Sequence, residues 1–136
     1  MGLKYQLQHM LDGLVGRAAI LDLTARHNRL YSAGDVDGWI STFRHSGGSY
    51  RCGARDFADL RTAFDGGNGR QLFSLDNEIS VDGVSATQRC AAVLLVGSEI
   101  VATGRCEGRL VYERGDWYFA SREVMWDPEP SGSPAS

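Results

Sequence analysis

The sequence lacks both a cluster of basic residues and a long apolar run. Its 14 Lys and Arg are scattered among 17 Asp and Glu, so that the formal net charge is −3. A chain without a basic stripe is poorly suited to neutralise a phosphate backbone, and we expect no nucleic-acid partner. No run approaches the roughly 20 apolar residues that span a bilayer, and residues 1–14 hold no apolar core of the signal-peptide kind. We therefore expect no membrane association and a cytoplasmic location.

Cysteine and histidine are scarce, with three of each. Cys52, Cys90 and Cys106 match no zinc spacing, and the last two lie in apolar runs, as buried reduced thiols do. His9 and His45 lie in polar surroundings without a second ligand at metal spacing. The 17 glycines form no phosphate-binding loop after a strand. We expect neither a metal nor another cofactor.

The first half of the sequence has the apolar spacing of helices. The region from Gly13 to Gly16 separates two helical stripes, and Gly34 marks the end of the second one. Aspartates at positions 35 and 56 are placed to cap two more helices, because a carboxylate accepts hydrogen bonds from free N–H groups of the first turn. The predicted elements are a lead-in helix over residues 1–14, a main helix over 15–31, and short helices over 35–43 and 56–64.

After residue 69 the pattern changes to long β-rich runs. Short breaks at Asp82-Gly83, Gly97-Ser98 and Gly115-Asp116 suit tight hairpins, so the runs predict an antiparallel meander. A brief earlier strand is predicted to pair elsewhere on the sheet. The predicted strands cover residues 49–52, 70–82, 85–96, 100–113 and 117–126.

These elements predict one α+β domain over residues 15–126, with helices packed on a curved antiparallel sheet. The tail over residues 127–136 is rich in proline, serine and glycine, and is predicted to be disordered.

Five stretches resemble, in order and spacing, the SnoaL-like branch of the nuclear-transport-factor-2-like (NTF2-like) superfamily. They are RAAILDL at 17–23, SAGDVDGW at 32–39 with Phe43, ISVDG at 79–83, Gly104-Arg105, and GDW at 115–117 continuing to Arg122. The resemblance implies a cone of three N-terminal helices on a curved sheet, usually an apolar pocket, and often a homodimer through the sheet. Members include ketosteroid isomerases, dehydratases and non-catalytic dioxygenase subunits, so the fold does not imply a reaction.

His27 is the first candidate catalytic residue. It lies eight residues before Asp35, which is the offset at which the ketosteroid isomerases of this superfamily place a catalytic tyrosine. An imidazole in a dry pocket can exchange a proton near neutral pH, and a hydrogen bond from His27 to Asp76 would orient it. The alternative readings are a core histidine satisfied by hydrogen bonds and, for Asp76-Asn77, a bulge or strand-end turn in water.

Two further positions follow from the same resemblance. Glu107 aligns with the protonated acid of the isomerases, but the apolar alternation of its strand favours the outer face. Arg51 stands where the isomerases carry their aspartate base, and arginine cannot act as that base because it stays protonated. We place Arg51 among the candidate substrate-binding residues.

Aromatic residues are numerous enough to line a pocket for a planar or apolar ligand. Trp39, Tyr50 and Phe73 are candidate lining residues, and Tyr31 or Tyr50 could donate a hydrogen bond to a substrate oxygen. The alternative is that they are ordinary core residues.

Two functions remain open at this point. The first is binding of a small apolar or aromatic, carbonyl-bearing molecule in the cone, with cofactor-free lyase or isomerase activity in which His27 is the acid/base and Asp76 or Glu107 orients it. The second is a non-catalytic binding or assembly module, dimeric through its sheet like the small subunit of a ring-hydroxylating dioxygenase. In that case Arg105 and Arg109 on the outer face would meet acidic residues of a partner.

Overall fold

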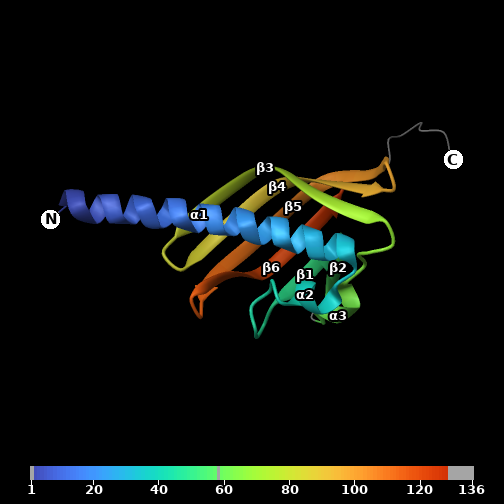
Figure 1. Ribbon diagram of the computed structural model, residues 1–136, viewed down its shortest axis with the longest axis horizontal. Coiled ribbons are helices and arrows are strands. Elements are labelled where there is room, and N and C mark those ends of the chain that lie inside the picture. Colours follow the sequence, from blue (N-terminus) through green and yellow to red (C-terminus); the bar gives the residue numbers. More distant parts are fainter. Residues whose placement is uncertain (1, 58, 129–136) are drawn as a thin grey trace.

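The computed structural model describes residues 2–57 and 59–128, and within them a long helix lies across a strongly curved sheet (Figure 1). The strand order in the sheet is β2-β1-β6-β5-β4-β3. The elements in chain order are α1 (Gly2–Ala33), α2 (Val36–Ile40), β1 (Ser49–Cys52), β2 (Arg55–Phe57), α3 (Leu60–Ala63), β3 (Arg70–Asp82), β4 (Ser85–Val96), β5 (Glu99–Glu113) and β6 (Asp116–Trp126).

The four long strands form the predicted meander, with antiparallel pairing from β3 to β6. The sheet as a whole is mixed, however, because β1 pairs with β6 in parallel. The prediction of a purely antiparallel sheet was therefore wrong at this edge. The β1–β2 hairpin reaches the sheet from the α2 side and joins it beside the last strand, where the two chain directions coincide.

α1 is a single helix where the sequence predicts two. Glycine costs about 1 kcal/mol inside a helix, which does not break a long one. Gly16 is buried where α1 crosses β3, and a Cβ at this position would lie 3.3 Å from Val81 Cγ1. The glycine thus allows a close helix-to-sheet approach.

The third helix also differs from its prediction. Residues 55–57 form β2, and α3 covers only Leu60–Ala63. Asp59 caps it in place of Asp56, accepting a hydrogen bond of 3.0 Å from the Arg61 backbone N–H. The predicted cap of α2 is confirmed, since Asp35 accepts from the Gly38 N–H at 2.9 Å.

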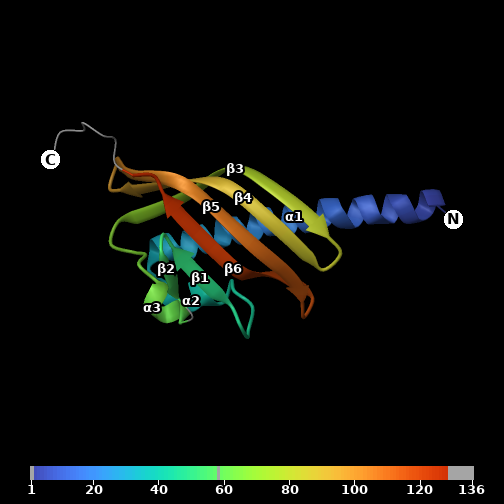
Figure 2. The ribbon, with the colours of Figure 1, turned by 180° about the vertical axis from the view of Figure 1, so that it is seen from behind.

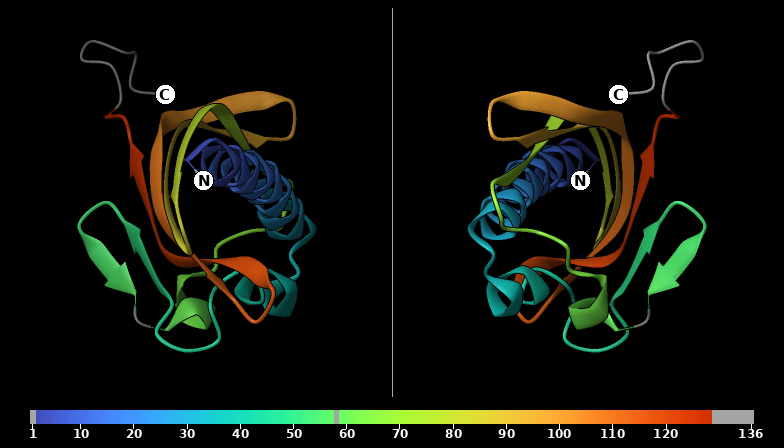
Figure 3. Two further views of the ribbon diagram at one scale, coloured as in Figure 1. Left: turned by 90° about the vertical axis from the view of Figure 1, so that its left-hand side faces the viewer. Right: turned by 90° about the vertical axis from the view of Figure 1, so that its right-hand side faces the viewer.

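The sheet curls around α1, and Figure 3 shows the helix end-on inside the curve. The core lies between this concave face and the helices. Its fully buried side chains include Ile20 of α1, Trp39 of α2, Leu110 of β5, and Phe119 and Val124 of β6. Seen from behind in Figure 2, the opposite face of the sheet carries no helix and is the outer face.

The N-terminal half of α1 extends past the sheet (Figure 1). Its large apolar side chains are exposed, from 51% for Leu7 to 76% for Tyr5. The predicted tail from residue 127 falls outside the described residues from position 129 onward. Asp127 itself is tied to β5, where its backbone N–H donates to the Thr103 carbonyl. No helix in the described ranges is long and apolar enough to cross a membrane.

Candidate functional site

His27 lies in the buried core, on the face of α1 that meets α2. Trp39 Nε1–H donates to His27 Nε2 at 3.1 Å, and His27 Nδ1 lies 2.8 Å from Thr42 Oγ1. Indole N–H can only donate, so Nε2 is the acceptor and Nδ1 carries the proton. The Thr42 hydroxyl donates in turn to the Trp39 carbonyl at 2.6 Å. The three residues form a closed chain of hydrogen bonds, which we call the His27 network.

The His27 network holds the imidazole neutral. His27 is 1% exposed, and its ring packs against Trp39, Phe43 and Phe119 at centroid distances of 5.0–5.6 Å. Burial first, and the positive charge of Arg122 second, lower its pKa well below 6.5. Both ring nitrogens of His27 are hydrogen-bonded. This favours the alternative interpretation from the sequence, a core histidine whose hydrogen bonds are satisfied.

The structure does not bring Asp76 or Glu107 to His27. Asp76 is exposed at φ +53° in a β3 bulge, where the register shifts between Leu75 and Glu78. The predicted hydrogen bond between His27 and Asp76 is therefore wrong, because the bulge directs this short segment into water. Glu107 is exposed on the outer face, as the alternation of its strand predicts.

The candidate tyrosines and Trp39 lie on the helix side of the sheet. Trp39 is 1% exposed and stacks edge-on against Tyr50 at 5.5 Å. Burial raises the pKa of Tyr50, and it also raises the pKa of Tyr31 to about 12. The Tyr31 hydroxyl accepts a hydrogen bond of 3.2 Å from Arg70 Nε. Both phenols stay protonated at neutral pH and are hydrogen-bond donors.

Phe73 and Arg51, the other two candidate binding residues, point away from the cone. Phe73 is 45% exposed on the outer face of β3. Arg51 forms ion pairs with Asp56 at 3.4 Å and Glu123 at 3.8 Å on the same face. The prediction that Phe73 and Arg51 line a pocket inside the cone is wrong, because strand alternation directs both side chains outward.

The cone instead contains a charged residue that sequence reasoning missed. Arg122 on β6 is 2% exposed, and its neighbour in register on β5 is Gly108. Its guanidinium lies 4.8 Å from the Phe119 ring, and Nη2 lies 3.5 Å from Ser74 Oγ. Arg122 Nε has no hydrogen-bond partner, and no carboxylate within residues 2–57 or 59–128 forms an ion pair with it.

A β-bulge explains why the sequence did not reveal Arg122. Trp117 and Phe119 are buried, and strict alternation would then place Arg122 on the outer face. The pairing of β5 with β6 skips Ala120, and the skip reverses the alternation, so that Arg122 and Val124 are buried. The burial of Arg122 could have been predicted only from the position of this bulge.

Hydrogen bonds through Ser74 connect Arg122 to polar side chains of three other elements, and we call the whole set the interior polar cluster. Two of its amide oxygens, Asn28 Oδ1 and Gln88 Oε1, are buried without a hydrogen-bond partner. Their Nδ2 and Nε2 groups are engaged, since Asn28 donates to Ser74 Oγ at 3.0 Å and Gln88 donates to Thr24 Oγ1 at 2.9 Å and to Asn77 Oδ1 at 3.0 Å. The members are Thr24, Asn28, Ser74, Asn77, Gln88 and Arg122.

This arrangement can recognise an anion and a hydroxyl together. A buried guanidinium without a counter-ion carries a desolvation cost that an anionic or strongly polarised oxygen would offset. The free oxygens of Asn28 and Gln88 are acceptors for an O–H or N–H group. No group of three or more metal-ligating side chains occurs in the described ranges.

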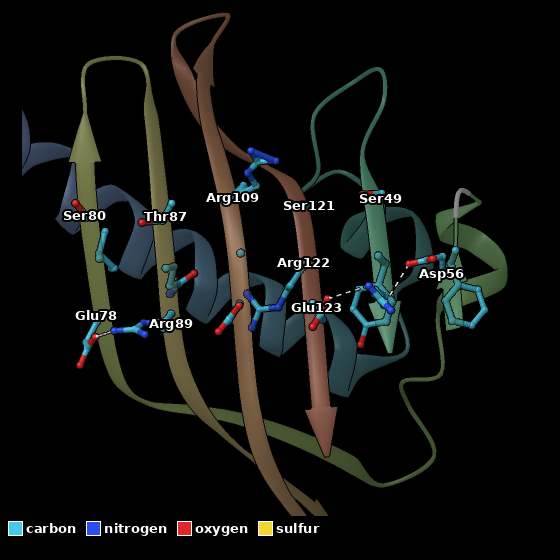
Figure 4. Close-up of a pocket in the computed structure, with 17 residues that line it drawn as sticks. Ser49, Asp56, Glu78, Ser80, Thr87, Arg89, Arg109, Ser121, Arg122 and Glu123 are labelled. Carbon is cyan, nitrogen blue, oxygen red and sulfur yellow. Dashed lines mark hydrogen bonds and ion pairs between the residues drawn. The ribbon is translucent and has the colours of Figure 1, made fainter. Parts of the chain in front are cut away.

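A hollow of about 980 Å³ lies against the outer face of the sheet, and Tyr50, Gln88 and Arg122 are among the residues that line it. The close-up in Figure 4 views the sheet with the helices behind it. One row of charges crosses it from β3 to β2, and Arg89 pairs with Glu78 at 2.8 Å. Glu107 and Glu123 are direct cross-strand neighbours in this row. The complete row, in strand order, is Glu78, Arg89, Glu107, Glu123, Arg51 and Asp56.

Comparison with solved structures shows the same fold at low sequence identity. An NTF2-like protein with a cystatin-like fold from Novosphingobium aromaticivorans is 21% identical, with a TM-score of 0.74 over 98% of this chain and 91% of that one. A single-residue variant of Rv3472 from Mycobacterium tuberculosis, a protein of unknown function, is 24% identical, with a TM-score of 0.76 over 90% and 83%. A protein of unknown function from Nostoc punctiforme is 20% identical, with a TM-score of 0.73 over 83% and 92%.

No protein of curated function matches the chain. The model of one family, described as the SnoaL-like domain, matches residues 14–123. That range contains α1 from Leu14 onward, the meander as far as Glu123 in β6, and every member of the interior polar cluster. The chain therefore belongs to the SnoaL-like domain family, within the NTF2-like group of folds.

Proposed function

We propose that this protein binds a small apolar or aromatic molecule inside the cone, with a carbonyl or carboxylate oxygen of the ligand against Arg122. The observation that carries the proposal is the buried guanidinium without a carboxylate partner among the residues that the structure describes. A charge-assisted hydrogen bond contributes about 1.5–3 kcal/mol, and more of it is retained where water is excluded.

The rest of the site supports a ligand of mixed character. Apolar neighbours of Arg122 on the inner face include Phe119 and, on the adjacent strand β1, its partner in register Tyr50. The unpartnered oxygens of Asn28 and Gln88 would accept a hydrogen bond from a ligand hydroxyl. A carbonyl oxygen at one end and a hydroxyl near the other are the features of a β-hydroxy carbonyl compound.

This geometry supplies one part of cofactor-free lyase or isomerase chemistry, the stabilisation of negative charge on a substrate oxygen. Negative charge would develop on the substrate oxygen, and Arg122 is already oriented and desolvated to stabilise it. His27 is not used as acid or base in this proposal, because both of its nitrogens are occupied in the His27 network. The Tyr50 phenol, protonated at neutral pH, would be a second donor to the same oxygen.

The test compares cinnamate with cinnamyl alcohol, which has the same skeleton without the charge. We expect cinnamate to raise the melting temperature and the alcohol to leave it nearly unchanged. Arg122→Met should weaken cinnamate binding by roughly 30-fold, the equivalent of about 2 kcal/mol.

The same variant should be more stable without ligand by about 2 kcal/mol, because methionine fills the space and removes a buried unpaired charge. Arg109→Met on the outer face is the matched control and should leave cinnamate binding unchanged. Full cinnamate affinity in Arg122→Met would disprove the proposed site.

The outer face supports a second candidate function, assembly as a homodimer through the sheet. Two exposed apolar side chains of β3 lie on this face near the charged row, Phe73 at 45% and Leu75 at 50% exposure. Directly opposed like charges such as Glu107 and Glu123 are unfavourable in isolation. Arg105 and Arg109 of a second copy could neutralise them.

Sedimentation equilibrium tests this assembly. We expect a dimer for the natural sequence and at least a tenfold weaker association for Leu75→Lys, because the lysine would have to be buried between two sheets. Val84→Lys places the same charge on a residue that is 66% exposed at the β3–β4 turn, and it should not change the mass. A monomeric natural protein at micromolar concentration would exclude the dimer.

A further inference from the structure

The solvent side of α1 carries a line of large apolar side chains that are between 41% and 72% exposed. They follow one another at steps of four, three, four and seven residues, which is the 3.5-residue period of a helix that packs along another helix. We call this set the α1 stripe, and its members are Leu3, Leu7, Met10, Leu14 and Leu21.

The α1 stripe lies on the side of the helix that faces away from the sheet. Gly16 is buried against β3, and Leu14 precedes it by two residues, or about 200° around the helix axis. The stripe begins in residues 2–15, the part of α1 that extends past the sheet and that we call the overhang, and it continues to Leu21, beyond the crossing with β3 (Figure 1). It therefore runs for about 27 Å along the helix and is separate from both the cone and the outer face of the sheet.

The α1 stripe is complementary to itself when a second copy runs in the opposite direction. A two-fold axis centred on residue 12 places Leu3 opposite Leu21 of the second copy, and Met10 opposite Leu14. Because the axis exchanges the two copies, each of these contacts forms twice. The pair covers both stripes and is closed, so it does not extend to a third copy.

The remaining member of the stripe, Leu7, meets position 17 of the second copy. The small Ala18 beside that position leaves a hole into which a leucine side chain can insert, as in a coiled coil. Arg17 is held toward β3, because its Nη2 donates to the Ile79 carbonyl at 3.1 Å. The contact therefore stays apolar at the one step where the leucine spacing is broken.

Two charges beside the stripe favour the antiparallel direction over the parallel one. Lys4 and Asp22 are 18 residues apart, which is five helical turns, so they lie on the same flank of the stripe. In the antiparallel pair each Lys4 comes within one turn of Asp22 of the other copy, whereas a parallel pair would set like charges against each other. Both side chains are exposed, and neither forms an ion pair within residues 2–57 or 59–128.

We propose that the α1 stripe binds a second copy of this chain as an antiparallel helix pair, in which each overhang lies along the sheet-packed half of the other α1. Burial of both stripes removes on the order of 1,000 Å² from water, which is near the lower limit of a specific interface, so we expect a dissociation constant of roughly tens of micromolar. Lys4 is the one Lys or Arg of the overhang, which therefore lacks the basic polar face of helices that bind anionic lipid. The contact uses neither the interior polar cluster nor the outer face, and it goes beyond both functions proposed above.

Sedimentation equilibrium of the Leu75→Lys variant isolates this contact, because that substitution removes the outer-face contact whether or not the latter forms. We expect a monomer at low micromolar concentration and mostly dimer at several hundred micromolar. Adding Leu14→Lys should weaken this association at least tenfold, since the lysines would be buried near the centre of the pair. Adding Tyr5→Lys is the matched control and should change nothing, because Tyr5 is 76% exposed and lies nine residues from Leu14, on the opposite side of the helix.

Charge reversal tests the antiparallel direction in the same background at 0.1 M salt. Lys4→Asp or Asp22→Lys alone should weaken the association by roughly threefold or more, because each sets like charges against each other at two places. The double variant Lys4→Asp/Asp22→Lys should restore it. The two residues are about 27 Å apart within one α1, beyond the screening length, so the rescue reports contacts between copies. A double variant as weak as the single ones would overturn the antiparallel pair.

Hydrogen exchange supplies a second readout of the same contact. At low micromolar concentration the overhang is unpaired and its amides exchange through fraying, and at several hundred micromolar they should exchange several times more slowly. In the presence of Leu14→Lys the rate should not depend on concentration. A Leu75→Lys variant that stays monomeric at several hundred micromolar would overturn the proposal, and its cosedimentation with phosphatidylcholine vesicles would then assign the stripe to a lipid surface instead.

Discussion

Replacing His27 by alanine is expected to lower the free energy of unfolding by about 4 kcal/mol. The substitution removes a ring that three aromatic side chains contact, and it leaves a cavity in a core that is fully buried here. It also leaves the Trp39 indole N–H without an acceptor, and a buried unpaired donor costs about 1–3 kcal/mol on its own. Urea denaturation followed by tryptophan fluorescence would measure the loss.

His9→Ala is the matched control, since His9 lies on the exposed half of the same helix. Its unfolding free energy should stay within about 0.5 kcal/mol of the natural value. A folded His27→Ala variant that loses less than about 1 kcal/mol would contradict the structural role of the His27 network. Any loss of function in His27→Ala should accordingly be interpreted only after its stability has been measured.

The same network makes stability depend on pH. The unfolded chain binds a proton at His27 below pH 6.5, while the native imidazole stays neutral because burial lowers its pKa. The contribution of His27 is therefore complete above pH 6.5, and it is lost at about 1.4 kcal/mol per pH unit as the pH falls toward the native pKa. Unfolding curves at pH 7, 6 and 5 would show this slope, and its absence would mean that His27 is protonated in the native state.

Gly104→Ala is expected to cost about 3 kcal/mol through overpacking against the backbone. A Cβ at this position of β5 would collide with the Met125 carbonyl oxygen and would lie 2.8 Å from Trp126 Cα. Both atoms belong to the paired strand β6, so relief requires β5 and β6 to separate locally. The melting temperature should fall by several degrees, and differential scanning calorimetry would measure it.

Gly108→Ala provides a control on the same strand and the same face. Its Cβ would lie 3.4 Å from the Ser121 carbonyl oxygen and 3.6 Å from the Phe119 ring, which is ordinary contact. We expect a change below about 1 kcal/mol there. Equal losses of stability in Gly104→Ala and Gly108→Ala would contradict this prediction. They would show that the backbone of β6 moves away from residue 104 at little cost.

Much of the architecture could be predicted from local sequence signals. The boundaries of β3 and β4 coincide with those predicted from Asp82-Gly83 and Gly97-Ser98, because hairpin turns need residues that tolerate a positive φ. Gly83 and Gly97 have φ values of +61° and +63°. The resemblance to the SnoaL-like family predicted the conical fold. The family model that matches the sequence and the solved structures with the same fold confirm this prediction.

The elements that were missed depend on contacts between distant parts of the chain. The parallel pairing of β1 with β6 joins residues about 70 positions apart, and no local pattern encodes it. Gly16, where the sequence predicted an interruption, lies within the continuous α1 and packs against Val81 of β3. Both features follow from tertiary packing, which overrides local propensity.

The candidate site was harder to predict because small register changes decide which side chains face inward. One skipped residue on β6 turns Arg122 into the cone, and one bulge on β3 turns Asp76 out of it. Catalytic residue types are also poor guides when a histidine serves the core, as His27 does. Sequence spacing identified the correct strands and the outward direction of Glu107, but not the directions of Arg51, Phe73 and Arg122.

The N-terminal half of α1, which extends past the sheet, should unfold more readily than the rest of the domain. Helices of this length are marginal in water by themselves, and the residues in the range 2–15 are exposed except Gly13, which is half-buried. They remain helical because the buried half, from Gly16 onward, provides a nucleus from which the helix can propagate. Backbone amides of the overhang should exchange with solvent deuterium through fraying, many times faster than those beside Ile20 and Leu23, which exchange only when the whole domain opens.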